Sequence, residues 1–113
     1  MIQAPVQPRR RSLPLREHDY TEPGAYFITV CTKDRRCIFG DVVEGQMMLN
    51  SFGDEVNAAW RELPDRFGSV ELDQCVVMPN HFHGILALTT AAPSLSVLVS
   101  AFKSLSSFRI NLK

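Results

Sequence analysis

Apolar and polar positions alternate most clearly in the middle of the chain, where two strand-like runs flank a turn. Residues 70–78 and 81–88 are rich in β-branched and other apolar side chains, and Pro79 and Asn80 between them are typical turn residues. This pattern predicts a tight β-hairpin. Its expected cross-strand pairs are Met78 with His81 and Val76 with His83.

Two histidines lie one residue apart at the start of the second run. On a strand, His81 and His83 share one face while Phe82 faces the core, so two imidazole nitrogens can converge on one divalent cation. On a helix the same pair would be about 200° apart and could not share an ion. The spacing also occurs in strands whose histidines lie half-exposed without a metal, and both interpretations stay open from spacing alone.

A third ligand is harder to assign from the hairpin pattern. Gln74 falls on the same face as the histidines and is the nearest polar candidate for a further contact to the ion. Asp73, chemically the better ligand, is expected to face away unless a β-bulge intervenes.

The N-terminal half predicts an arm followed by further strands. Residues 1–19, with three prolines and an arginine cluster, indicate a basic extended arm with little structure of its own, and residues 20–113 form one domain. A strand is expected over residues 25–32, and a minor hairpin over residues 41–49 with its turn at Glu44-Gly45.

Two segments have helical periodicity. Asn50 or Ser51 caps the first helix, which ends at Pro64. Ser94 caps the second. Their apolar stripes are Phe52, Val56, Trp60 and Leu63 in the first, and Leu95, Leu98, Phe102, Leu105 and Leu112 in the second.

The order strand, minor hairpin, helix, strand, strand, helix predicts an α+β fold. It matches a ferredoxin-like split βαβ sandwich, an antiparallel sheet with two helices on one face. The final strand of that fold has no counterpart in the chain, so one sheet edge is expected to be unprotected.

Composition narrows the class of protein. With 113 residues, 45% of them hydrophobic, the chain has material for one small core. No apolar run is long enough for a membrane helix or a signal peptide, which predicts a cytoplasmic protein. Cys31, Cys37 and Cys75 have no metal-binding spacing and are expected to be buried, inert thiols.

The net charge of zero conceals an uneven distribution. Residues 1–36 carry seven basic and four acidic side chains, residues 93–113 carry three basic and none acidic, and the middle is acidic. A phosphate backbone would lie along the basic segments, although charges this sparse also suit a solvated surface. The candidate DNA-binding residues are Arg9, Arg10, Arg11, Arg16, Arg35, Arg36 and Lys103.

Taken in order, several segments of the chain resemble the REP-associated tyrosine transposases. These belong to the single-tyrosine HUH (histidine-hydrophobe-histidine) transposase superfamily of bacterial insertion sequences. The residues that carry the resemblance are 16–20, 23–32, 35–40, 76–84 and 102–104.

The resemblance implies a chemistry of single-stranded DNA. In such enzymes the histidine pair holds Mg²⁺ or Mn²⁺, the ion polarises the scissile phosphate, and a tyrosine hydroxyl attacks to leave a 5′-phosphotyrosine. Carried over to this chain, it implies metal binding at His81 and His83 and hairpin-forming single-stranded DNA repeats as partner. A homodimer is a candidate assembly, although the sequence does not give the oligomeric state.

The nucleophile of the family has no counterpart here. Both tyrosines, Tyr20 and Tyr26, precede the histidines, whereas the family's tyrosine lies in a helix well downstream. The favoured expectation is therefore a truncated transposase that binds DNA and a cation but is inactive alone. The alternatives are a non-catalytic DNA-hairpin binding module and a metal-dependent nuclease that uses water or borrows a tyrosine helix from a partner chain. Tyr26 and Phe27 could stack on a base, but core packing is the expected role of both.

Overall fold

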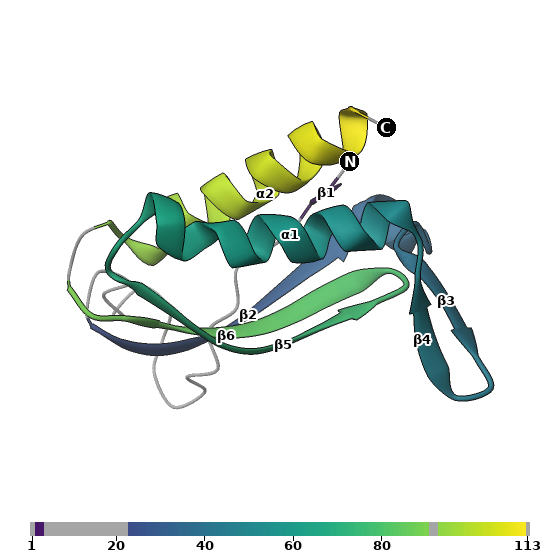
Figure 1. The fold of residues 1–113 in the computed structure, drawn as a ribbon, viewed down its shortest axis with the longest axis horizontal. Helices are drawn as coiled ribbons and strands as arrows, with labels where there is room; N and C mark the ends of the chain where they lie inside the picture. Colours follow the sequence, from purple (N-terminus) through teal and green to yellow (C-terminus); the bar gives the residue numbers. More distant parts are fainter. Residues whose placement is uncertain (1, 4–22, 91–92, 113) are drawn as a thin grey trace.

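The computed structural model describes residues 2–3, 23–90 and 93–112. Three long antiparallel strands lie in the order β2 (Gly24–Thr32), β6 (His81–Leu88) and β5 (Val70–Met78). Helices α1 (Ser51–Arg66) and α2 (Leu95–Asn111) lie together over one face of this sheet, and among the described residues no helix lies on the other face, called the helix-free face below (Figure 1). The predicted α+β, ferredoxin-like split βαβ architecture is confirmed.

A two-residue strand, β1 (Ile2–Gln3), lies at the outer edge of β2. It pairs antiparallel with the end of β2, Ile2 opposite Thr32 and Gln3 opposite Cys31. The open N–H and C=O groups of an edge strand accept a further strand, even a short one, so two residues of this edge are covered where the sequence predicts an unprotected sheet edge. The predicted basic arm with little structure of its own stays a prediction. The remainder of the predicted arm lies outside the described residues.

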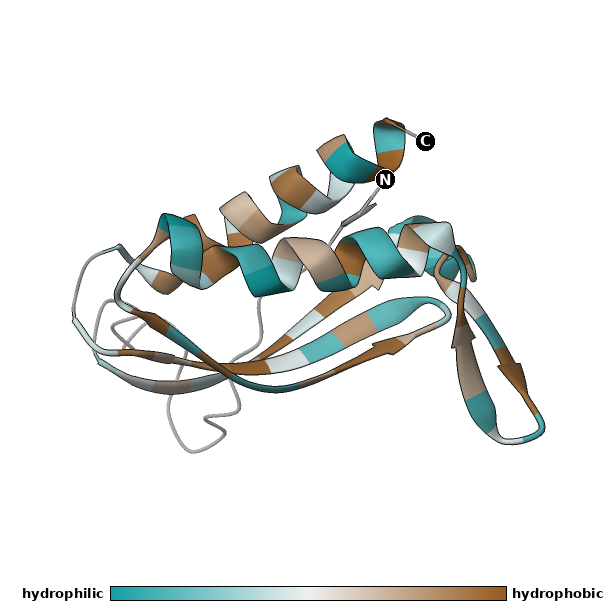
Figure 2. Cartoon of the chain, viewed as in Figure 1, coloured by the Kyte–Doolittle hydropathy of each residue, from teal (hydrophilic) through white to brown (hydrophobic). Residues whose placement is uncertain are grey.

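The core fills the space between the sheet and the two helices. Alternate residues of β6 are buried against the helices. Hydropathy alternates in the first half of this strand, whereas the second half is apolar throughout (Figure 2). The largest fully buried side chains are Trp60, Phe39, Phe82 and Phe102. Phe82, the residue between the two histidines, is therefore part of the core.

Helix α1 begins as predicted but ends later. The Asn50 side chain accepts a hydrogen bond from the Gly53 backbone N–H at 2.9 Å, which caps the helix. Pro64 was expected to end the helix, but it lies inside, and the helix continues to Arg66. So close to the C-terminal end, proline removes only one backbone bond, and the Phe67 N–H closes the last turn on the Leu63 carbonyl at 2.8 Å.

Helix α2 packs on α1 through its predicted apolar stripe, with one exception. Leu112 was expected on the stripe, but it lies just past the helix end and is 71% exposed. Near that end, Arg109 bonds Glu55 at 2.9 Å and Glu62 at 3.2 Å, both on α1. These ion pairs hold the two helices together, so this basic residue has a structural role.

The predicted minor hairpin is also present. Strands β3 (Gly40–Val43) and β4 (Gln46–Leu49) are joined by Glu44 and Gly45, which have positive φ angles of 51° and 78°. Two consecutive left-handed residues are the signature of a tight two-residue hairpin turn. The hairpin projects from one end of the main sheet (Figure 1).

Replacing Ser106 by alanine is expected to stabilise the protein by about 1 kcal/mol, because a buried hydroxyl without a partner carries an uncompensated desolvation cost. The Ser106 hydroxyl is buried in α2 and has no hydrogen-bond partner within the described residues. Urea denaturation measures the change. Ser104→Ala on the exposed side of the same helix is the matched control, since it gives the same gain in helix propensity without the burial. Equal effects of the two substitutions would contradict the prediction.

Candidate functional site

The histidine hairpin has the predicted register. Met78 lies opposite His81 and Val76 opposite His83. Because Phe82 faces the helices, the two histidines project from the opposite, helix-free face of the sheet. Their ring centroids are 4.6 Å apart, close enough for both rings to reach one ion, since a metal bonds an imidazole nitrogen at about 2.0–2.1 Å.

Each histidine uses its Nδ1 atom in a hydrogen bond to a neighbouring side chain. His81 Nδ1 lies 2.7 Å from Asn80 Oδ1, and His83 Nδ1 lies 3.0 Å from Thr29 Oγ1. Thr29 reaches His83 because the two residues are cross-strand partners in β2 and β6. These contacts leave Nε2 of each ring as the nitrogen that a cation can approach.

The surroundings of His81 favour the neutral ring. Partial burial lowers the pKa of His81 below its usual value, and the neighbouring His83 and the positive charge of Arg35 lower it further. A neutral imidazole keeps the lone pair that metal coordination requires. Near neutral pH His81 is therefore in the protonation state of a ligand.

The donor set fits a divalent cation in part. Two imidazoles suit Mn²⁺ and other transition metals, whereas Mg²⁺ prefers oxygen donors. Within the described residues no group of three or more His, Cys, Asp or Glu side chains could hold a metal. An ion bound by His81 and His83 would need further oxygen ligands from an amide, water, a phosphate or a side chain outside those residues.

Gln74 lies close to the histidines, as the hairpin pattern suggested. It lines a shallow pocket of about 200 Å³ together with His83, Phe27 and neighbouring residues of β5 and β6. The register of β5 shifts between Leu72 and Cys75, which indicates a β-bulge. A bulge at this place was the condition under which Asp73 could face the same side as the histidines. Asp73 and Gln74 thus lie together opposite a single residue of β6, and both side chains are exposed.

The two aromatic residues of β2 have different surroundings. Tyr26 is 3% exposed and packs in the core, as expected. Phe27 was also expected in the core, but it is only half-buried, and its ring centroid is 5.5 Å from that of His83. The alternation of a strand requires this difference, since neighbouring side chains face opposite sides of the sheet.

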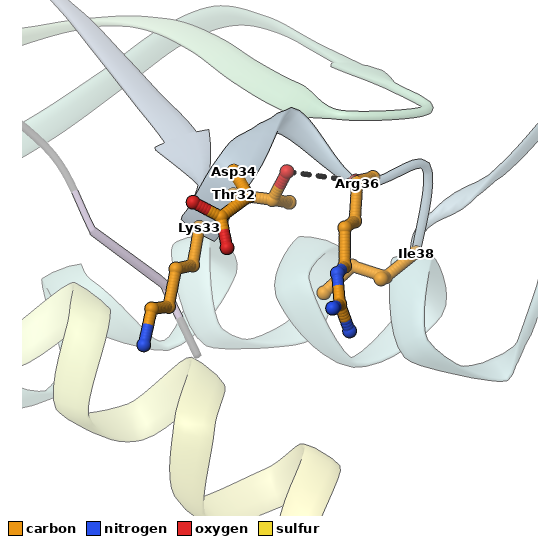
Figure 3. A pocket seen from close by; sticks show the side chains of 5 residues that line it. All are labelled: Thr32, Lys33, Asp34, Arg36 and Ile38. Carbon is orange, nitrogen blue, oxygen red and sulfur yellow. Dashed lines mark hydrogen bonds between the residues drawn. The ribbon is translucent and has the colours of Figure 1, made fainter.

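Three of the predicted basic residues lie in the described part of the chain, and they are on different elements of the fold. Arg35 lies near enough to His81 to influence its pKa, while Arg36 lines a separate pocket of about 330 Å³ with Lys33 at the end of β2 (Figure 3). Lys103 lies on α2, on the helix side of the sheet. The arginines of the arm, Arg9, Arg10, Arg11 and Arg16, lie outside the described residues.

The cysteines are more exposed than predicted. Cys31 is half-buried, and Cys37 and Cys75 are exposed. The Cys75 thiol lies 3.7 Å from the Asn57 side-chain oxygen. Partial burial raises the pKa of Cys75, an effect that Arg61 opposes, so its thiol stays protonated and is a poor metal ligand near neutral pH.

Two residues of the site, Asn80 and Thr29, were not singled out from the sequence. The sequence predicts Asn80 only as a turn residue and Thr29 only as part of a strand. Because Asn80 directly precedes His81 in the sequence, a contact between the two side chains could have been predicted. Thr29 can be recognised as part of the site only when the pairing of β2 with β6, and its register, are known.

Comparison with known proteins gives little further information about the site. No family model matches the chain. The chain is 43% identical over 79 residues to an uncharacterised protein of Haemophilus influenzae, an alignment that covers 70% of this chain and 44% of that protein. The chain thus spans less than half the length of this relative. Within the described residues, no helix has both the length and the apolar character needed to cross a membrane.

Proposed function

We propose that this chain is a transposase-like domain that binds single-stranded DNA and a divalent cation on the helix-free face of its sheet. The observation that carries the proposal is the pair of imidazoles, His81 and His83, whose Nδ1 atoms are both engaged and whose Nε2 atoms are available on that face. The resemblance to the REP-associated tyrosine transposases adds the DNA substrate.

The bound cation would act as a Lewis acid on a DNA phosphate. His81 and His83 would hold it, with Mn²⁺ favoured over Mg²⁺ because two of the donors are nitrogens. Gln74, which lines the same pocket as His83, is the nearest amide oxygen for a further ligand. A DNA phosphate would provide additional oxygen.

The DNA strand itself would be held by charge and stacking. Arg35, near His81, attracts the phosphate backbone, and the half-buried ring of Phe27 beside His83 offers a surface on which a base can stack. Stacking tolerates any base because every base has a π-face. Sequence preference would therefore have to come from contacts other than this one.

Covalent cleavage needs a tyrosine that the described residues do not provide on this face. Tyr26 is buried in the core on the helix side, so its hydroxyl is not directed at the histidines. We therefore propose DNA and cation binding as the activity of this chain by itself. Cleavage through a phosphotyrosine would require a tyrosine helix from a partner chain or from another segment.

The proposal is tested by replacing both His81 and His83 with alanine. Mn²⁺ is expected to raise the melting temperature of the wild-type chain but not that of the double variant, because the variant has lost both nitrogen ligands. Asn57→Ala, on helix α1, is the control for a general effect of a substitution, and it should respond to Mn²⁺ like the wild type. An equal Mn²⁺ response in the wild type and the double variant would overturn the metal site.

The same proteins are then incubated with a DNA hairpin that has single-stranded flanks. A gel shift is expected for the wild type, enhanced by Mn²⁺, with neither nicking nor a covalent adduct. Mn²⁺-dependent nicking without an adduct would replace the proposal by a nuclease that uses water. No binding with or without Mn²⁺ would overturn the DNA part of the proposal.

A further inference from the structure

We infer that Asn80 and Thr29 are positioning residues: Asn80 fixes the tautomer of His81, and Thr29 supports the ligand tautomer of His83, so that both Nε2 lone pairs are available to a cation. The inference rests on the proposed function, since it concerns the same histidines. It goes beyond that function because it assigns a role to two side chains through their contacts with the histidines and not through a contact with the cation or DNA. A ligand histidine commonly donates its second N–H to a neighbouring acceptor, which orients the ring and strengthens the ligand.

The orientation of the Asn80 amide follows from its second contact. Its Nδ2 lies 3.4 Å from the backbone carbonyl oxygen of Arg35, which can only accept a hydrogen bond. The NH₂ group must therefore face Arg35, and the Oδ1 atom must face His81. The carbonyl of Arg35, on a different element of the fold, thus determines which Asn80 atom meets the histidine.

The tautomer of His81 follows in turn. Oδ1 of Asn80 has no proton to give, so the 2.7 Å contact is a hydrogen bond only if His81 Nδ1 carries the proton and donates. A neutral imidazole has one ring proton. With that proton on Nδ1, the lone pair is on Nε2, the nitrogen that a cation can approach.

Thr29 acts on His83 in a less restrictive way. A hydroxyl both donates and accepts, so the 3.0 Å contact to His83 Nδ1 is compatible with either tautomer. When Nε2 binds a cation, the ring proton must be on Nδ1, and the Thr29 hydroxyl oxygen is in place to accept a hydrogen bond from Nδ1–H. Thr29 thus stabilises the ligand form of His83.

Asn80 also attaches the histidine strand to the turn that carries Arg35. Its backbone carbonyl accepts a hydrogen bond from the Thr32 N–H at 3.0 Å and shares the Thr32 hydroxyl, at 3.2 Å, with the Arg36 carbonyl at 2.7 Å. In the turn, Asp34 and Arg35 have positive φ angles of 56° and 55°, a left-handed conformation that costs free energy in residues other than glycine. Contacts from Asn80 help to hold this strained turn, and with it the Arg35 charge, next to His81.

The tautomers can be measured without any metal. Two-bond ¹⁵N–¹H correlation spectra, recorded well above the usual imidazole pKa of about 6.5, distinguish Nδ1–H from Nε2–H rings. We expect His81 to be the Nδ1–H tautomer in the wild type and in Asn80→Asp, whose carboxylate still accepts, and to lose this preference in Asn80→Ala. An Nε2–H ring in the wild type, or an unchanged tautomer in Asn80→Ala, would overturn the role of Asn80.

Calorimetric titration with Mn²⁺ alone tests the consequence for the site. Asn80→Ala and Thr29→Val are each expected to weaken Mn²⁺ binding by about 10–100-fold, whereas Thr29→Ser, which keeps the hydroxyl, should retain wild-type affinity. Asn57→Ala, on helix α1, is the matched control and should not change the affinity. Wild-type affinity in both Asn80→Ala and Thr29→Val would overturn the inference while leaving the metal site intact. A wild-type chain that binds no Mn²⁺ would instead overturn the proposed function.

Discussion

Replacing Trp60 by alanine is expected to lower the free energy of unfolding by about 3–5 kcal/mol, the range for a large aromatic residue removed from a core. Trp60 is 1% exposed. Its ring centroid is 4.9 Å from that of Phe82 and 5.5 Å from that of Phe102, so one side chain joins α1 to β6 and α2. Aromatic pairs at these distances add to the stabilisation from burial. Urea denaturation monitored by circular dichroism measures the loss.

Phe108→Ala is the matched control for the loss of an aromatic ring. Phe108 lies on α2 and is 63% exposed, so its removal should change the free energy of unfolding by no more than about 0.5 kcal/mol. If Trp60→Ala and Phe108→Ala have similar effects, the buried aromatic cluster does not dominate the stability of the fold. Should Trp60→Ala fail to fold, Trp60→Phe gives a smaller loss that can still be compared with the control.

The same cluster connects stability to the candidate site. Phe82 lies between the two histidines in sequence, and its ring packs on Trp60 and Phe102 on the helix side of the sheet. His81 and His83 project from the opposite side of the same strand. The core therefore holds the strand segment from which both imidazoles project, so a loose core would also loosen the metal-binding pair.

The sequence predicts this part of the fold well because two independent signals agree there. A period of two in residues 81–88 defines which side chains face the core, and the Pro79-Asn80 turn defines the register. A shift by one residue would have moved Phe82 to solvent and the histidines into the core. Because such a shift would greatly raise the free energy of the folded state, the apolar pattern is compatible with one register only.

Other features depend on contacts between distant segments, which periodicity does not report. From the sequence, the bulge in β5 is only an alternative to a regular strand, because the apolar pattern does not reveal an inserted residue. The pairing of Ile2–Gln3 with β2 adds an edge strand too short to have a period. The continuation of α1 past Pro64 reflects its position in the last turn, where few backbone bonds remain to be lost.

The candidate site is likewise predictable in part. A histidine pair on one face follows from strand alternation alone, but the hydrogen bonds to Asn80 and Thr29 depend on a turn and on a neighbouring strand. DNA as the substrate follows neither from strand alternation nor from these hydrogen bonds. It is proposed from the resemblance to the REP-associated tyrosine transposases. Arg109 illustrates the limit of charge patterns, because a basic residue in a basic segment turns out to pair with two glutamates of α1.

Replacing Gly84 by alanine is expected to destabilise the protein by about 1–3 kcal/mol, the cost of overpacking a filled core. In most strands the same substitution is stabilising, because alanine has less conformational freedom in the unfolded chain. Here a Cβ atom would lie 2.7 Å from Cη2 of Trp60 and 2.8 Å from Cε1 of Phe82, both closer than carbon atoms approach in folded proteins. Gly84→Ala thus tests whether the glycine after the histidine motif is required by Trp60.

A double-mutant cycle with Trp60→Phe separates this contact from other effects, because phenylalanine lacks the Cη2 atom that the new methyl group would strike. Gly84→Ala should be less destabilising in the Trp60→Phe background, with a coupling free energy of about 0.5–3 kcal/mol. Gly68→Ala is the matched control, since a Cβ atom there meets nothing within 4 Å, and it should be neutral or slightly stabilising. Equal costs of Gly84→Ala in both backgrounds would show that Trp60 does not impose the glycine. A reduced cost would assign Gly84 to the packing of the strand beneath the histidines, and not to the cation or DNA.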